Sequence, residues 1–404
     1  MTADDADLLS WRKLLRGPDI SASPPPLQAF FYLYTAIDFP NYTPSTYNNT
    51  IMSAYPHHIA ILGAGTIGLS MVAAHLRRQD TKVTIYDPRP DFEAQLRAQL
   101  PLYLDASIGE SKNPPDPSKD AIDNLFSTRL SIVPSIRDAV HSATIVQEQS
   151  PEILASKQSL WTEVAKHAQP NAHLWSSSSG IPASAQCATC GADIAERLLV
   201  AHPFNPPHLM PVIEVVPSPQ TKPERVEFVR GYFLGVPGPA PVTGSTSIQG
   251  CATSSTSPYY RPVVQNKEIP GFVGNRLAFA LFREACYLVG EGVVSAQDLD
   301  TVATASVGPR WAVGGVFESY HAGGGPGGID AFMNKLGPTI QDVWKQLGQI
   351  QLPAEGEPQE KWREIVVRQT QEAYGPTASA EAKKEKNIMI KGVVEMQKNC
   401  WKDF

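Results

Sequence analysis

Short apolar runs alternate with stretches of helical periodicity from His57 to about Gln265. HIAIL is an apolar run typical of a strand, LSMVAAHLRRQ has the apolar spacing of a helix, and KVTIYD is a second strand. Further strands are predicted at LSIVPS, TIVQEQ, AHLWSSS and RLLVAHPF, with helices at IRDAVHSA and from about Pro151 to His167. Strands that alternate with helices indicate an α/β fold built on a parallel, doubly wound sheet.

The pattern changes near Asn266. GFVGNRLAFALFREACYLVGEG has apolar residues at helical spacing, SAQDLDTVATAS is predicted as a capped helix, and helical sequence continues toward the C-terminus. We therefore predict an α/β domain of residues 57–265, followed by a mainly α-helical domain of residues 266–404.

Two segments do not fit this organisation. Residues 1–56 are rich in Pro, Ser, Thr, Asn and Tyr without helical or strand periodicity, which predicts a flexible extension. Residues 237–260 are of low complexity and form an unusually long connection inside the first domain. Met52 directly precedes the first strand, so residues 1–51 and 237–260 are open to the interpretation that the native protein lacks them.

Composition narrows the class of protein. Of the 404 residues, 42% are hydrophobic and 18% charged, which is typical of a soluble globular protein. The net charge of −6 is spread along the chain without a Lys/Arg cluster, so neither nucleic acid nor a membrane surface is an expected partner. The absence of an apolar run of roughly 18–20 residues and the acidic start MTADDAD predict a cytoplasmic location.

The five cysteines are few and odd in number, as expected in a reducing compartment. Cys187 and Cys190 form a single CxxC without a second pair or a nearby histidine. We interpret them as two plain thiols and predict no metal site.

The turn GAGTIG follows the first strand and opens a helix. Its three glycines have the GxGxxG spacing that allows a tight turn, a close approach of pyrophosphate and close packing of helix on strand. An acid at the end of the next strand accepts hydrogen bonds from the adenosine ribose and disfavours a 2′-phosphate, which predicts a Rossmann-type domain that binds NAD. The residues assigned to the cofactor here are Gly63, Gly65, Thr66, Ile67, Gly68 and Asp87.

His202 and Glu214 are candidates for catalysis. His202 lies at the carboxyl end of RLLVA, where doubly wound sheets bind their ligands, and Glu214 interrupts the apolar run VIEVV. A glutamate paired with a histidine would fix the tautomer of the ring and make it a better base. Taken alone, His202 is better explained as a structural histidine at a strand end, and His208 is predicted to lie on the surface.

Several motifs together resemble the L-3-hydroxyacyl-CoA dehydrogenase superfamily over residues 58–348, with 237–260 excluded. The motifs are ILGAGTIG, VQEQSPE with its lysine, SSSSGI, AHPFNPPHLMPVIEVV and KEIPGFVGNRL. The resemblance implies a catalytic pair of His202 and Glu214 and a Rossmann-type domain followed by a helical one. It further implies a serine at the substrate oxygen and nicotinamide, an asparagine at the substrate carbonyl, and two residues near cofactor and substrate, which fall on Ser179, Asn275, Glu152 and Lys157.

Each of these four positions has an ordinary structural interpretation as well. Ser179 fits a polar loop and Asn275 a helix N-terminus. Glu152 and Lys157 fit charges on a solvated helix face.

Residues 308–328 resemble the branch of the family with L-gulonate 3-dehydrogenase (lambda-crystallin) and L-carnitine dehydrogenase. The segment after Asp87 also lacks the lysine-rich helical hairpin that the acyl-CoA enzymes place over CoA. Arg310 is suited to a free carboxylate and Trp311 to a cationic or sugar-like substrate. A structural arginine and a core or dimer-interface tryptophan are the alternatives.

The predicted function is NAD-dependent oxidation of the 3-hydroxyl of an L-3-hydroxy acid or a 3-hydroxyacyl-CoA, by a homodimer. One alternative is an enzyme of the 6-phosphogluconate or β-hydroxyacid dehydrogenase type, whose base is a lysine. Another is a structural, crystallin-like protein that binds NAD without catalysis.

Overall fold

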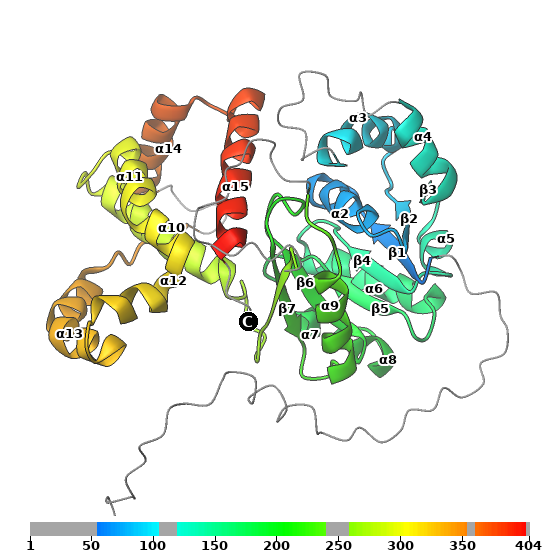
Figure 1. Cartoon of the computed structure of the whole chain (residues 1–404), viewed down its shortest axis with the longest axis horizontal. Helices are drawn as coiled ribbons and strands as arrows, with labels where there is room; N and C mark the ends of the chain where they lie inside the picture. Colours follow the sequence, from blue (N-terminus) through cyan, green and yellow to red (C-terminus); the bar gives the residue numbers. More distant parts are fainter. Residues whose placement is uncertain (1–54, 105–118, 240–257, 354–359, 401–404) are drawn as a thin grey trace, which may run out of the picture. The chain divides into compact units, whose positions relative to one another are not determined.

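The computed structural model describes residues 55–104, 119–239, 258–353 and 360–400. Of the predicted extension, residues 1–54 lie outside these ranges, and of the predicted insertion, residues 240–257 do. Tyr259 and Tyr260, at the end of the predicted insertion, are buried in the core of the first domain. Strands and helices alternate along the first part of the chain, and only helices follow residue 264 within the described ranges (Figure 1).

The strands of the described residues form one sheet in the order β3-β2-β1-β4-β5-β6-β7-β8. Strands β1 to β6 run parallel, as the sequence predicts. The strands are β1 (His57–Leu62), β2 (Thr81–Tyr86), β3 (Leu130–Ile132), β4 (Ile145–Glu148), β5 (His173–Ser176), β6 (Leu198–Pro203), β7 (Val212–Pro217) and β8 (Arg261–Val264).

Helices lie between the strands and make up the second part of the chain. Those between strands are α2 (Thr66–Leu76), α3 (Phe92–Leu104), α4 (Lys119–Thr128), α5 (Ile136–Val140), α6 (Leu154–His167), α7 (Ala183–Gln186), α8 (Ala192–Ala195) and α9 (Pro223–Leu234). The later ones are α10 (Gly274–Gly290), α11 (Ala296–Val302), the π-helical turn η1 (Ala303–Val307), α12 (Gly308–Gly323), α13 (Gly328–Gln346), α14 (Lys361–Tyr374) and α15 (Ala380–Cys400). Within the described ranges, none of these helices is both long and apolar enough to span a bilayer.

The predicted doubly wound sheet is mostly parallel, and its last two strands depart from the direction of the others. β7 is antiparallel to β6, and β8 is parallel to β7. Residues 204–211 connect β6 to β7, and a parallel crossover would need a dozen or more residues, so the chain has to turn back. The register of this pairing sets His202 directly opposite Glu214.

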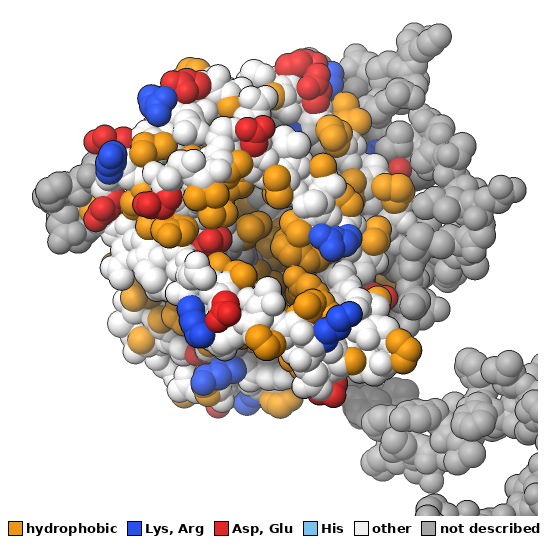
Figure 2. Space-filling model, turned by 90° about the vertical axis from the view of Figure 1, so that its left-hand side faces the viewer, with side chains coloured by type: hydrophobic (Ala, Val, Ile, Leu, Met, Phe, Trp, Pro, Cys, Tyr) orange, Lys and Arg blue, Asp and Glu red, His pale blue; other side chains and the backbone are white. Residues whose placement is uncertain are grey.

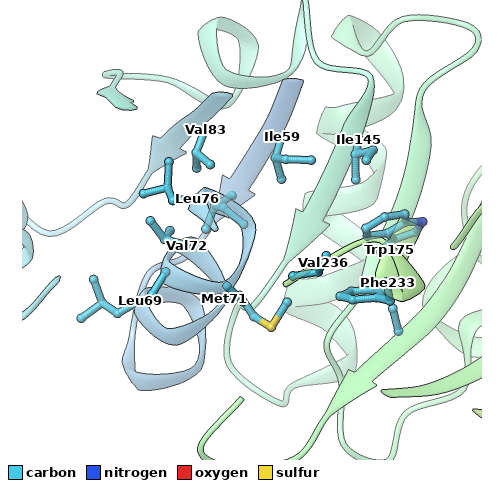
Figure 3. Close-up of a cluster of buried hydrophobic side chains, with 14 of the residues drawn as sticks. Ile59, Leu69, Met71, Val72, Leu76, Val83, Ile145, Trp175, Phe233 and Val236 are labelled. Carbon is cyan, nitrogen blue, oxygen red and sulfur yellow. The ribbon is translucent and has the colours of Figure 1, made fainter. Parts of the chain in front are cut away.

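The core has two apolar clusters that share alternating residues of the central strand. Ile59 and Ile61 of β1 belong to one cluster, whereas Ala60 and Leu62 belong to the other. Successive side chains of a strand point to opposite faces, so both faces of the sheet are buried. Figure 3 shows the first cluster, in which α2 packs on the sheet beside Trp175 and Phe233.

The later helices leave many large apolar side chains exposed. Phe279 of α10, Phe317 of α12 and Trp344 of α13 are each more than half exposed. Figure 2 shows hydrophobic side chains gathered around a hollow on the face of the molecule that carries these helices. Apolar surface of this extent is typical of an interaction site rather than of a free surface.

Replacement of Gly68 by alanine should destabilise the fold, because an added Cβ would lie 2.3 Å from the carbonyl oxygen of Gly63. We expect Gly68→Ala to lower the free energy of unfolding by about 1–3 kcal/mol, as overpacking does elsewhere. Urea unfolding would measure the loss.

Gly231→Ala in α9 is the matched control, since a Cβ there meets no atom within 4 Å. Alanine should raise the stability of that helix by about 0.5–1 kcal/mol. Equal stability changes in the two variants would contradict the steric argument.

Candidate active site

His202 and Glu214 form a buried hydrogen-bonded pair across β6 and β7. The Nδ1 atom of His202 lies 2.8 Å from Oε2 of Glu214, and both side chains are buried. The antiparallel register positions the pair, because residues directly opposite each other on adjacent strands bring their side chains together. The rings of Phe204 and Phe272 flank the imidazole, with centroids at 4.9 and 5.8 Å.

The second oxygen of Glu214 is held by three donors. Oε1 accepts hydrogen bonds from Gln265 Nε2 at 2.8 Å and from the backbone amides of Val273 and Gly274 at 3.0 and 2.8 Å. Burial raises the pKa of Glu214, but the bonds from His202 and from the start of α10 outweigh it and hold the pKa below its usual value. The carboxylate therefore stays ionised, and because it can only accept a hydrogen bond, it favours the tautomer of His202 with the proton on Nδ1 and the lone pair on Nε2.

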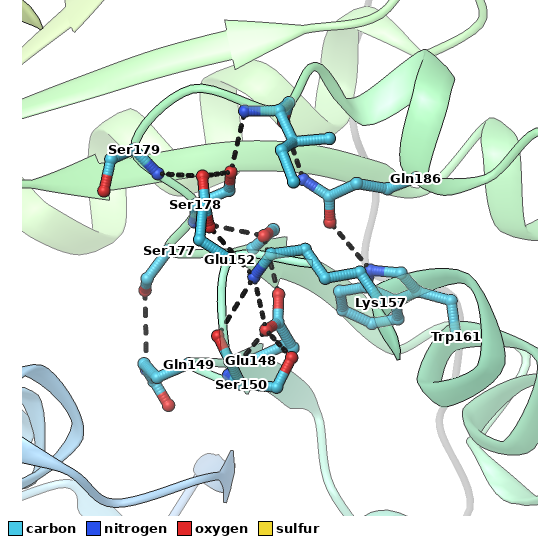
Figure 4. Close-up of polar contacts among 12 residues, drawn as sticks. Glu148, Gln149, Ser150, Glu152, Lys157, Trp161, Ser177, Ser178, Ser179 and Gln186 are labelled. Carbon is cyan, nitrogen blue, oxygen red and sulfur yellow. Dashed lines mark hydrogen bonds and ion pairs between the residues drawn. The ribbon is translucent and has the colours of Figure 1, made fainter. Parts of the chain in front are cut away.

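Ser179 lies in a tight loop after β5 that Glu152 and Asn275 hold in shape. Oε1 of Glu152 accepts hydrogen bonds from the amides of Ser179 and Gly180, both at 3.0 Å, and from the hydroxyl of Ser178 (Figure 4). Nδ2 of Asn275 donates to the carbonyl oxygen of Ser179 at 2.7 Å. Because Asn275 follows the residue whose amide binds Glu214, the start of α10 joins the serine loop to the His202–Glu214 pair.

Lys157 is buried beneath this loop and is not a solvated helix charge. Its side chain is only 1% exposed. The Nζ atom lies 2.8 Å from Oε1 of Glu148, 3.3 Å from the carbonyl oxygen of Ser150 and 3.4 Å from Oε2 of Glu152. Three acceptors match the three donors of an ammonium group. Lys157 is thus connected to the serine loop through Glu152. Burial raises the pKa of Glu152, but the hydrogen bond from Ser178 and the charge of Lys157 outweigh it and hold the pKa below its usual value.

Glu148 belongs to the site although the sequence analysis did not single it out. It is fully buried at the end of β4 and accepts hydrogen bonds from Ser150, Lys157 and Ser176. A carboxylate that ends an apolar strand needs a partner, and a lysine on the next helix is that partner here. This combination is visible in VQEQSPEILASK and could have identified the residue.

The glycine turn has the geometry that a dinucleotide needs. Gly63 has a φ of +89°, which favours glycine, and its amide donates to the carbonyl oxygen of Tyr86 at 2.9 Å. A Cβ on Gly65 would meet no atom within 4 Å, so the space over the turn is open to phosphate groups. No side chain caps the N-terminus of α2 and no acid lies in its first turn, which leaves its amides to bind an anion.

The other residues predicted to contact the cofactor lie around this turn. Thr66 is exposed at the start of α2, and Ile67 is half-buried against the core. Asp87 follows β2, and its Oδ2 accepts the amide proton of Ala64 at 2.9 Å. Burial raises the pKa of Asp87, and its bonds to Arg89 and to the Ala64 amide lower it below the usual value.

Arg310 and Trp311 lie on α12. Nε of Arg310 donates to the carbonyl oxygen of Ser306 at 3.4 Å, and Trp311 is 36% exposed. Among the described residues, no hydrogen bond joins either side chain to the His202–Glu214 pair or to the serine loop. Their role at the substrate stays a prediction.

His208 is buried, which corrects the prediction of a surface residue. Its Nδ1 lies 2.8 Å from the hydroxyl of Ser70 in α2, and its amide donates to the same hydroxyl. Burial lowers its pKa to about 4, so the ring is neutral. The segment between β6 and β7 folds onto α2, and this tertiary contact covers a residue that the proline-rich sequence suggested was exposed.

Cys187 and Cys190 are free thiols, and burial raises the pKa of Cys187. Across the ranges that the structure describes, no group of three or more His, Cys, Asp or Glu side chains is arranged to hold a metal ion.

Comparison with known proteins gives the family. Residues 58–245 match the family described as 3-hydroxyacyl-CoA dehydrogenase, NAD binding domain, and residues 271–357 match the 3-hydroxyacyl-CoA dehydrogenase, C-terminal domain. A 3-hydroxyacyl-CoA dehydrogenase of Gibberella moniliformis is 35% identical over 285 residues, which cover 70% of this chain and 78% of the relative. An L-carnitine dehydrogenase of Pseudomonas putida is 31% identical over 340 residues, which cover 84% of this chain and 94% of the relative.

Solved structures share the architecture. The 5-formyl-3-hydroxy-2-methylpyridine 4-carboxylic acid 5-dehydrogenase, an NAD+-dependent dismutase, superposes with a TM-score of 0.61 at 25% identity and covers 84% of this chain and 97% of its own. A 3-hydroxyacyl-CoA dehydrogenase from Archaeoglobus fulgidus has the same fold, with a TM-score of 0.52 at 20% identity over 84% of this chain and 98% of its own. The chain thus belongs to the 3-hydroxyacyl-CoA dehydrogenase family and is an NAD-dependent oxidoreductase that acts on a CH–OH group.

Proposed function

We propose that the protein oxidises the 3-hydroxyl of an L-3-hydroxy acid or of a 3-hydroxyacyl-CoA to the 3-oxo product, with His202 as general base. The observation that carries the proposal is the buried His202–Glu214 pair, in which Nδ1 of His202 lies 2.8 Å from Oε2 of Glu214. A proton on Nδ1 would leave the lone pair of the ring on Nε2, where it can act as a base. Relatives named L-carnitine dehydrogenase, at 31–33% identity, support a 3-hydroxy acid among the substrates, since carnitine is one.

Bound NAD supplies the hydride acceptor. His202 takes the hydroxyl proton on Nε2, and the imidazolium that forms is stabilised by the carboxylate of Glu214. Because Glu214 is already ionised and hydrogen-bonded before the reaction, its charge needs no reorganisation when the proton arrives. A positioned base of this kind contributes roughly 10²–10⁴-fold to the rate.

Ser179 and Asn275 polarise the developing carbonyl. Asn275 uses one N–H of Nδ2 on the carbonyl oxygen of Ser179, and an amide nitrogen has a second N–H to offer the substrate. Ser179 is exposed in the loop that Glu152 shapes, so its hydroxyl is accessible to a substrate oxygen.

A lysine base, as in the 6-phosphogluconate or β-hydroxyacid dehydrogenase type, is less well supported. Lys157 is the lysine of the site, and it is buried with an acceptor for each of its three protons. A lysine amine surrounded by three acceptors has no lone pair to offer a substrate hydroxyl.

We also propose that two copies associate through the exposed apolar faces of α10, α12 and α13, with Phe279, Phe317 and Trp344 among the contacts. A second copy is the expected occupant, because a self-complementary patch closes a two-fold dimer and leaves no apolar face in solvent. The apolar character of these faces is typical of a permanent homodimer.

His202→Ala should lower kcat by roughly 10²–10⁴-fold while leaving the Kd for NAD unchanged, because the ring acts on the hydroxyl proton and not on the cofactor. NADH formation with a panel of 3-hydroxy acids, including L-carnitine, and acetoacetyl-CoA reduction would measure kcat. His208→Asn is the control, because it replaces another buried histidine and keeps a partner for Ser70. Normal turnover of His202→Ala, or equal losses in both variants, would sink the assignment. A wild type that binds NAD tightly but shows no activity on any substrate would favour the structural, crystallin-like protein.

Glu214 should make stability depend on pH in a defined direction. Its pKa lies below 4.5, its ordinary value, in the folded chain, so its contribution to stability is fully present above that value and is lost as pH falls through the lowered pKa. Glu214→Gln removes this contribution. The stability difference between wild type and variant, measured by urea unfolding, should therefore be largest near neutral pH and shrink below 4.5. A difference that does not change with pH would contradict this role.

Phe317→Glu should shift the protein from dimer toward monomer, because it places a charge where an 82% exposed ring of α12 would be covered. Light scattering after size-exclusion chromatography would give the mass. Gln341→Glu, at an exposed polar position of α13, adds the same charge and should leave the dimer intact. A monomeric wild type would refute the proposed dimer.

A further inference from the structure

The carboxylate of Asp87 has no acceptor site left for the ribose that it is predicted to bind. A carboxylate offers about four lone-pair sites, two on each oxygen. Oδ1 accepts from the backbone N and from Nε of Arg89, at 3.1 and 2.7 Å. Oδ2 accepts from the amide of Ala64 at 2.9 Å and from Nη2 of Arg89 at 2.8 Å.

Arg89, in contrast, keeps donor capacity. Besides its two bonds to Asp87, Nη2 donates to the carbonyl oxygen of Ala64 at 3.2 Å and Nη1 to Oε1 of Gln95 at 2.9 Å. These contacts use four of the five N–H groups of a guanidinium, so one on Nη1 has no partner among the described residues. The side chain of Arg89 is 40% exposed and that of Asp87 only 5%, so the cation is the part of the pair that a ligand meets.

Hydrogen bonds hold the Asp87–Arg89 pair to the glycine turn. Ala64, between Gly63 and Gly65, donates its N–H to Asp87, and its carbonyl oxygen accepts from Arg89. The pyrophosphate of a dinucleotide lies over this turn, and the acid that follows the second strand marks the adenosine ribose. Arg89 therefore lies where the 2′ substituent of that ribose would be.

We propose that Arg89 sets the cofactor selectivity of this protein and that the chain binds NADP as well as NAD, with Arg89 as the ligand of the 2′-phosphate. A free aspartate would repel that phosphate, but here the aspartate is neutralised by an arginine whose fork matches phosphate geometry. The 2′-hydroxyl of NAD gains less binding free energy from this pair, because the oxygens of Asp87 that would accept its proton already accept other hydrogen bonds. The proposal concerns cofactor binding alone and stands whether or not the 3-hydroxyl chemistry proposed above is correct.

Calorimetric titration of NAD and NADP into the wild type and into Arg89→Leu, without substrate, tests the proposal. We expect wild type to bind both and Arg89→Leu to weaken NADP relative to NAD by about ten- to a hundredfold, as loss of a charge-assisted hydrogen bond does. Arg97→Leu is the matched control and should leave the ratio of the two dissociation constants unchanged. Arg97 is similarly exposed and binds two carboxylates, those of Glu93 and Asp123, on α3 and α4.

Asp87→Asn is the second variant, in case Arg89→Leu fails to fold. It retains Arg89 and removes the negative charge, so it should strengthen NADP relative to NAD. The proposal is overturned if wild type does not bind NADP, if Arg89→Leu weakens both cofactors equally, or if Asp87→Asn leaves the ratio unchanged.

Discussion

The antiparallel pairing of β6 with β7 is the constraint on which the active site depends. It is the point at which an otherwise parallel sheet reverses, and its register sets a histidine directly against a glutamate in the sheet interior. Side chains alternate strictly between the faces of a strand, so a slip of one residue would send Glu214 to the opposite face. The short connection between the strands and the apolar residues on both sides of Glu214 oppose such a slip.

Placing charges inside a sheet is costly, and this protein compensates by giving each of them a full set of partners. Glu214 has four donors, from a side chain on β6, a glutamine after β8 and two backbone amides. Glu148, at the carboxyl end of β4, accepts hydrogen bonds from Lys157 and from the hydroxyl groups of Ser150 and Ser176. Removal of one partner from such a set leaves a buried charge unpaired, which is far more destabilising than loss of a surface ion pair. The hydroxyl groups of Ser150 and Ser176 are therefore part of the electrostatics that stabilise Glu148.

Much of this architecture follows from local sequence pattern, and the rest depends on tertiary contacts. The strands, the glycine turn and α10 follow from periodicity and spacing, which are properties of neighbours in the chain. The direction of β7 depends on loop length, which the chain does reveal. Burial of His208 and of Lys157 depends on which distant element covers them, and nothing in a local window encodes that. The capping of Asp87 by Arg89 is a choice of side-chain conformation that the motif alone leaves open.

The bonds from the first amides of α10 to Glu214 have a consequence for how the protein becomes competent. The carboxylate of Glu214 receives two of its hydrogen bonds from backbone amides 59 and 60 residues further along the chain, at the start of α10. A folding intermediate with a finished sheet but an undocked α10 would have its dinucleotide turn in place and its glutamate short of two donors. The same two amides thus connect the docking of α10 to the hydrogen bonds that hold the Glu214 carboxylate.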